Sequence, residues 1–151
     1  MSELKDTINA DLKAAMIARD TLKTQTLQGL KAAILNEEVA KKVREIGLDE
    51  TAIEQVIARE AKKRDEAAEL FDRGGNAESA AKERAEKEAL MVYLPKPLTE
   101  DELGKLIDSV IETMQPSGPQ DMGKVIGAVK GQAGSAGDGA IIAKLVREKL
   151  Q

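Results

Sequence analysis

The chain has 151 residues and contains no cysteine, histidine or tryptophan, and its aromatic side chains are Phe71 and Tyr93. The lack of cysteine excludes disulfides and thiolate metal sites. The lack of histidine excludes Ser-His-Asp and Cys-His catalytic arrangements and the usual zinc ligand sets. The remaining carboxylates are scattered among lysines and arginines, as is typical of solvated helix surfaces. We therefore predict no catalytic residue, no metal site and no cofactor.

Long apolar runs are also absent. The longest, residues 89–94, covers six positions, far fewer than a membrane-spanning helix needs. The N-terminal residues carry no apolar stretch typical of a signal peptide. No glycine-rich phosphate-binding motif of the P-loop or dinucleotide type is present. We expect a cytoplasmic protein that does not enter a membrane.

What the chain does contain favours helices. Hydrophobic residues make up 42% and charged residues 33%, and alanine, glutamate and lysine are abundant. Apolar residues at helical spacing predict helices over about 4–16, 22–46, 50–73, 76–94 and 99–115, a short helix from 121, and a last helix from 138. No segment has the period of a strand. The predicted fold class is all-α.

Two prolines within three residues, Pro95 and Pro97, interrupt the helical pattern. We place a domain boundary there, between a four-helix unit of residues 1–94 and a small three-helix unit of residues 95–151. Residues placed to cap helix N-termini are Asp49, Asn76, Thr99 and Asp138. Residues placed to end helices are Gly47 and the Gly74-Gly75 pair.

Further expectations concern side chains. Phe71 and Met114 are predicted to face the core of their helices. Glu78 with Lys82, and Glu83 with Lys87, have the spacing of ion pairs within one helix. Two basic clusters, at 41–44 and 62–64, have acidic neighbours and are interpreted as solvated helix faces.

The segment from Asp121 to Gly139 holds six of the twelve glycines. Gly123, Gly127 and Gly131 are four residues apart and would form a stripe without side chains along a helix. Each costs about 1 kcal/mol relative to alanine, which predicts a close approach of another backbone or of a ligand. Packing within the molecule is the favoured interpretation, and a surface for RNA is the alternative.

Charge is unevenly distributed along the chain. Residues 121–151 carry five basic and three acidic residues, a net charge of +2, although the whole chain has a net charge of −4. The RNA-binding candidates are Lys124 and Lys130, expected to reach roughly one face of their helix, and Lys144 and Arg147, three residues apart on the last helix. If the two helices lie side by side, the four charges could line one surface.

Three motifs carry a family resemblance. They are Tyr-Leu-Pro-x-x-Leu-Thr-Glu-x-Glu-Leu from Tyr93, Asp-Met-Gly-Lys-Val-Ile-Gly from Asp121, and Ala-Gly-Asp-Gly from Ala136. Together with the segment from Leu30 to Glu38, they resemble the YqeY family over essentially the whole chain. The C-terminal part is also similar to the tail domain of GatB, the B subunit of the glutamine-dependent Asp/Glu-tRNA amidotransferase.

This resemblance implies a non-catalytic accessory module that binds tRNA. One alternative is a protein-interaction module of a translation-related complex. Another is a component of a carbon–nitrogen ligase, with glutamine as nitrogen donor, that acts only with other subunits. The loop after the second motif carries Gln132, Gly134 and Ala136, where family members often carry lysine or arginine. We therefore expect weak tRNA binding that is largely lost at physiological salt.

Overall fold

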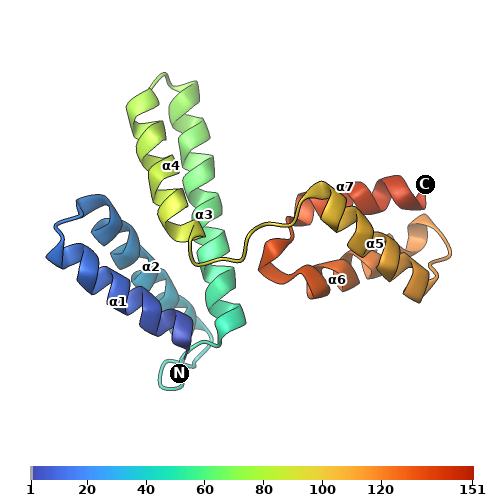
Figure 1. The fold of residues 1–151 in the computed structure, drawn as a ribbon, viewed down its shortest axis with the longest axis horizontal. Coiled ribbons are helices and arrows are strands. Elements are labelled where there is room, and N and C mark those ends of the chain that lie inside the picture. Colours follow the sequence, from blue (N-terminus) through green and yellow to red (C-terminus); the bar gives the residue numbers. More distant parts are fainter. Residues whose placement is uncertain (1) are drawn as a thin grey trace. The chain divides into compact units, whose positions relative to one another are not determined.

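The computed structural model describes residues 2–151, which form seven α-helices and two short 3-10 helices (Figure 1). In chain order these are α1 (Glu3–Ile17), α2 (Thr21–Ala40), α3 (Glu50–Arg73), α4 (Ala77–Met91), α5 (Glu100–Met114), η1 (Pro119–Asp121), α6 (Met122–Ala133), η2 (Gly134–Ala136) and α7 (Gly139–Leu150). No strand occurs in the described residues, so the predicted all-α fold is confirmed. Among residues 2–151, no helix is both long and apolar enough to cross a membrane.

The helices form two compact units, and the chain passes from one to the other between Leu94 and Pro95. We call residues up to Leu94 the N-terminal unit and residues from Pro95 onward the C-terminal unit. Each unit has its own apolar core.

The N-terminal unit consists of two helical hairpins, α1 with α2 and α3 with α4 (Figure 1). Its core contains Ile8, Leu12, Leu27, Leu30, Ile34, Leu48, Ile53, Val56, Ile57, Ala61 and Leu90. Within α1, α2 and α3 these residues recur mainly at three- and four-residue spacing, so each of these helices turns one apolar face inward. The hydroxyl of Tyr93 donates a hydrogen bond of 2.6 Å to Asp11 Oδ2, which ties the end of the unit back to α1.

The outer half of the α3–α4 hairpin lies beyond this core. There, the small side chains of Ala68 on α3 and Ala80 on α4 are fully buried. Ion pairs also join the helices, with Lys87 2.7 Å from Asp65 on α3. The predicted pairing of Lys87 with Glu83 is therefore wrong. The prediction that Phe71 faces the core is also wrong: its side chain is 37% exposed, because it lies beyond the last core residue of α3.

Most helix boundaries follow the predicted capping residues. The side chains of Asp49, Asn76, Thr99 and Asp138 each accept a hydrogen bond from a backbone N–H in the first turn of the helix that follows, which confirms all four as N-caps. The Gly74-Gly75 pair ends α3 as predicted.

The predicted end of the second helix is wrong, because α2 stops at Ala40 rather than near Gly47. Lys42 adopts a left-handed conformation (φ 59°). Its N–H donates to the carbonyl of Val39, and the N–H of Val43 donates to the carbonyl of Glu38. This is the Schellman arrangement that closes a helix C-terminus.

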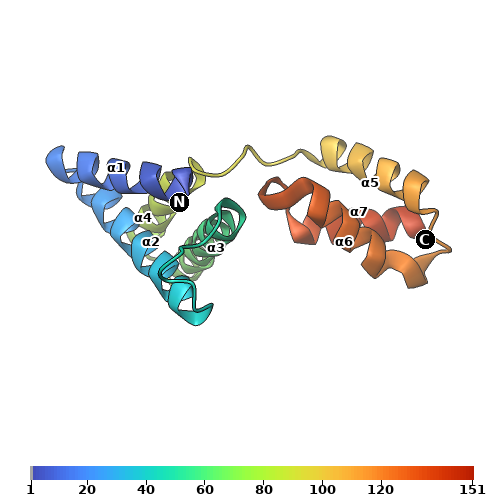
Figure 2. The ribbon, with the colours of Figure 1, turned by 90° about the horizontal axis from the view of Figure 1, so that it is seen from below.

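In the C-terminal unit, α5, α6 and α7 contact one another pairwise (Figures 1 and 2). The core contains Leu103, Ile107, Val110, Val125, Val129, Ile142 and Val146. Met114, predicted to face inward, is 41% exposed at the last residue of α5. Within this unit α6 and α7 lie side by side, which is the arrangement that the four basic candidates require.

Candidate functional site

The glycines of α6 lie on its exposed face. A Cβ atom built on Gly123, Gly127 or Gly131 meets no atom of the C-terminal unit within 4 Å. The core-facing side of the same helix is occupied by the fully buried Val125 and Val129. The favoured prediction, that the stripe packs against another part of the molecule, is therefore wrong within this unit. The stripe is a strip of open helix backbone, which we call the glycine face.

Lys124 and Lys130 flank the glycine face on opposite sides. At about 100° per residue, each lies about 60° from the line through Gly127, and the two are about 120° apart around the helix. The two lysines are thus farther apart around the helix than we expected, since the sequence predicted that they would reach roughly one face. The ammonium of Lys124 is 4.0 Å from Asp121 Oδ1, and its side chain is 77% exposed.

The side chain of Lys130 extends across to α7. A Cβ atom built on Gly139 would lie 3.1 Å from Lys130 Cε and 3.3 Å from Nζ. Any larger residue at 139 would therefore push this lysine aside. Gly139 begins α7, so the ammonium of Lys130 lies at the junction of the two helices.

Lys144 and Arg147 are exposed on α7. They lie on a different face of that helix from its buried residues, Ile142 and Val146. Among residues 2–151, neither has a carboxylate within 4 Å, whereas the neighbouring Lys149 is 2.6 Å from Asp108 on α5. At 1.5 Å per residue, Lys144 lies about 7.5 Å along α7 from Gly139. The basic candidates are thus distributed over two adjoining helices rather than gathered at one point.

The connection between α6 and α7 fixes this geometry. A Cβ atom on Gly137 would lie 2.6 Å from Ala133 Cβ and 3.0 Å from Ile142 Cδ1, so the chain has no room for a side chain there. Asp138 Oδ1 accepts hydrogen bonds from the N–H groups of Ala140 and Ile141. The carbonyl of Ala136 accepts a 2.8 Å hydrogen bond from the N–H of Leu98. The Ala-Gly-Asp-Gly motif therefore has a structural explanation: it packs against the end of α6, starts α7 and bonds to the segment that precedes α5.

Three of the six cations in the basic clusters of the N-terminal unit form ion pairs. Lys41 pairs with Glu37, Lys63 with Glu60 and Arg64 with Glu86. This supports their interpretation as paired helix faces.

One titratable side chain in the described part of the chain has a pKa that departs strongly from its usual value. Burial, together with the hydrogen bond to Asp11, raises the pKa of Tyr93 well above its usual value, so its hydroxyl stays protonated and engaged. In the part of the chain that the structure describes, no group of three or more acidic side chains is placed to hold a metal ion. The distinctive features of the C-terminal unit are thus its open backbone and its cations.

Comparison with known proteins agrees with the sequence motifs. The family model described as "Yqey-like protein" matches residues 5–150. One relative, "Altered inheritance of mitochondria protein 41, mitochondrial" from Lachancea thermotolerans, is 28% identical over 114 residues, which is 74% of this chain. The chain spans 60% of the length of that relative. Since the family model covers nearly every residue, the chain belongs to the YqeY family of Yqey-like proteins.

Proposed function

We propose that the protein is a non-catalytic RNA-binding module, with tRNA as its ligand, and that the glycine face of α6 is the contact surface. The observation that carries the proposal is the open backbone of Gly123, Gly127 and Gly131 between two lysines. A helix face without side chains lets a phosphate backbone come close. Lysines on either side then pair with successive phosphates.

Two further points support the proposal. Residues 121–151 carry a net charge of +2 in a chain whose net charge is −4. The C-terminal part also resembles the tail of GatB, a subunit of an enzyme that acts on tRNA.

The proposal includes a cytoplasmic location, and cell fractionation followed by immunodetection tests it.

The test is tRNA affinity measured across a salt series. Each lysine that contacts a phosphate contributes about one to the slope of log K against log salt. The Lys124→Ala, Lys130→Ala double variant should therefore bind more weakly and lower the slope by about two. A matched control is the Lys13→Ala, Lys62→Ala double variant, because both lysines are exposed and lie in the N-terminal unit. Equal affinity and slope in the two double variants would contradict the proposal.

A protein-interaction module is the second candidate, and the same glycine face favours it. Glycines four residues apart allow two helices to approach closely, so a helix of another protein could occupy the strip. In that case, wild type and the lysine double variant would bind tRNA equally weakly, and affinity purification would recover a protein whose binding depends on Gly127.

A carbon–nitrogen ligase role belongs to the proposal only within a complex, and an amidation assay with and without added subunits tests it.

A further inference from the structure

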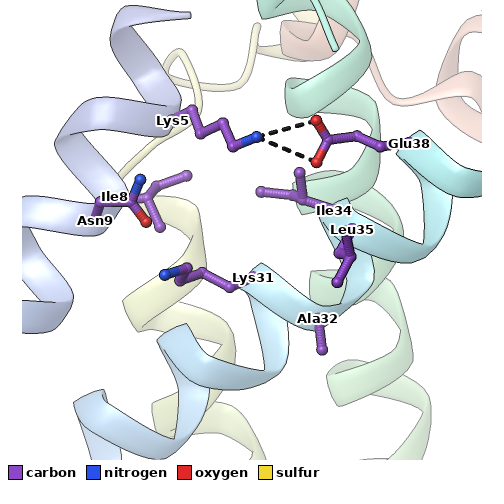
Figure 3. A pocket seen from close by; sticks show the side chains of 8 residues that line it. All are labelled: Lys5, Ile8, Asn9, Lys31, Ala32, Ile34, Leu35 and Glu38. Carbon is purple, nitrogen blue, oxygen red and sulfur yellow. Dashed lines mark hydrogen bonds and ion pairs between the residues drawn. The ribbon is translucent and has the colours of Figure 1, made fainter. Parts of the chain in front are cut away.

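A groove of about 270 Å³ opens between α1 and α2 in the N-terminal unit (Figure 3). In Figure 2 the two helices spread apart from the turn at 18–20, and the groove lies toward their other ends. Its apolar walls are Ile8 from α1 and Ala32, Ile34 and Leu35 from α2. Ile8 and Ile34 are buried, whereas Leu35 is 42% exposed. The volume is close to the lower end of the range for small-molecule sites, about 300–1,000 Å³.

Three charged side chains line the groove, and their charges do not cancel. The ammonium of Lys5 is 3.0 Å and 3.1 Å from the two carboxylate oxygens of Glu38, so these two residues neutralise each other. Lys31 extends from α2 toward α1 (Figure 3), and among residues 2–151 no carboxylate lies within 4 Å of its ammonium. The groove therefore has one unpaired positive charge beside its apolar walls.

Asn9 adds an unsatisfied polar atom. Its Oδ1 is shielded from solvent and accepts no hydrogen bond. The amide of Asn9 also carries an NH₂ group, a donor suited to an anion, and the residue lines the groove.

We propose that this groove binds a small organic anion with an apolar body, such as a medium-chain carboxylate. The hydrocarbon part lies against Ala32 and Leu35, the exposed apolar residues of the groove, and the carboxylate pairs with Lys31. Charge complementarity selects this class: a neutral apolar molecule leaves Lys31 unpaired, and a small polar anion leaves the exposed side chain of Leu35 uncovered. The site lies in the N-terminal unit and does not depend on the RNA proposal.

Octanoate is the probe for this proposal, titrated into the isotope-labelled full-length chain and followed by amide NMR shifts. We expect saturable shifts confined to residues around 5–9 and 31–38, with a Kd of about 1 mM, as suits a ligand of this size. Acetate, which lacks the tail, and 1-octanol, which lacks the charge, should each bind at least about tenfold more weakly. The absence of saturable octanoate shifts, or equal affinity for all three probes, would overturn the proposal.

Matched variants locate the site. Lys31→Glu should weaken octanoate binding about tenfold or more, whereas Lys13→Glu, an exposed lysine on α1 outside the groove, should not change it. Leu35→Asp should also weaken octanoate binding about tenfold or more. Its control is Val39→Asp, because Val39 is exposed on α2 but does not line the groove. All four residues are exposed, so the variants should fold, and their amide spectra check this directly. Identical octanoate affinity in the test and control variants would also overturn the proposal.

Discussion

Gly127 and Gly137 belong to the same stretch of chain but have opposite surroundings. A side chain at Gly127 meets open space, whereas a Cβ at Gly137 would lie 2.6 Å from Ala133 Cβ. Gly127→Ala should therefore stabilise the C-terminal unit by about 0.5–1 kcal/mol through helix propensity. Gly137→Ala should destabilise it by about 1–3 kcal/mol through overpacking. Urea unfolding of both variants measures the difference, and destabilisation by Gly127→Ala would mean that the glycine face is covered.

Tyr93 makes the stability of the N-terminal unit depend on pH in the alkaline range. Burial and the hydrogen bond to Asp11 raise the pKa of its hydroxyl above the ordinary value of 10.0. In the unfolded chain the hydroxyl ionises near pH 10, while in the folded chain it stays protonated. This stabilising contribution is therefore complete below pH 10 and is lost as pH rises above it.

The corresponding variant is Tyr93→Phe. It should cost about 1 kcal/mol at pH 7, the net value of a typical hydrogen bond. Between pH 9 and 11, its unfolding free energy should fall less steeply than that of wild type, because it lacks the group that titrates (about pH 10). Parallel slopes for the two proteins in chemical denaturation over this range would show that the hydroxyl is not protected by folding.

Three helices end in the same way but with different residues in the left-handed position. α1 has Arg19 there (φ 58°), α2 has Lys42 (φ 59°) and α3 has Gly75 (φ 76°). In each case the N–H of the next residue donates to the carbonyl five residues earlier: Asp20 to Ala15, Val43 to Glu38 and Asn76 to Phe71. The backbone geometry is thus shared, and the glycine and non-glycine residues differ in strain.

This comparison predicts opposite effects at equivalent positions. Arg19→Gly should stabilise the N-terminal unit by up to about 1 kcal/mol, because glycine adopts the left-handed conformation without steric cost. Gly75→Ala should destabilise it by about 1 kcal/mol, since no atom within 4 Å of its Cβ adds a clash to the strain. Thermal unfolding of the two variants measures both values. Shifts of the same sign would show that the left-handed geometry is not what controls these helix ends.

Local chemistry explains which element boundaries could be predicted. N-caps were predictable because a short polar side chain bonds to N–H groups two or three residues away, as at Asp49 and Thr99. The end of α2 was missed because Lys42 gives no compositional signal for a left-handed residue. The partner of Lys87 was missed because Asp65 lies on another helix, and only the packing of the hairpin brings the two together.

The same distinction applies to the candidate site. The sequence could show that three glycines share a helix face, but not whether that face is covered, which depends on how the valines of α6 meet α5 and α7. The extension of Lys130 over Gly139 depends on the same packing. The groove between α1 and α2 had no sequence signal, because Lys31 and Leu35 resemble any exposed residues of an amphipathic helix.

At the scale of the whole molecule, we predict that the two units fold as separate domains. A broad-specificity protease such as subtilisin should cut first at 95–97 or at 131–137, and only later within α2. Trypsin is unsuitable, because the bond after Lys96 precedes Pro97. Mass analysis of the early fragments identifies the cut sites. Early cleavage within α2 would argue against the two-domain organisation.

The central claim is that the open backbone of α6 is the RNA contact surface, and the Kd for tRNA of Gly127→Leu tests it most directly. This variant should be at least as stable as wild type, because its side chain enters open space. It should nevertheless bind tRNA about tenfold more weakly, equal to about 1.4 kcal/mol, because the side chain holds the phosphate backbone away. The control is Gly104→Leu, on α5, whose Cβ likewise meets no atom within 4 Å. A Gly127→Leu protein that is stable and binds tRNA as tightly as wild type and Gly104→Leu would contradict the claim.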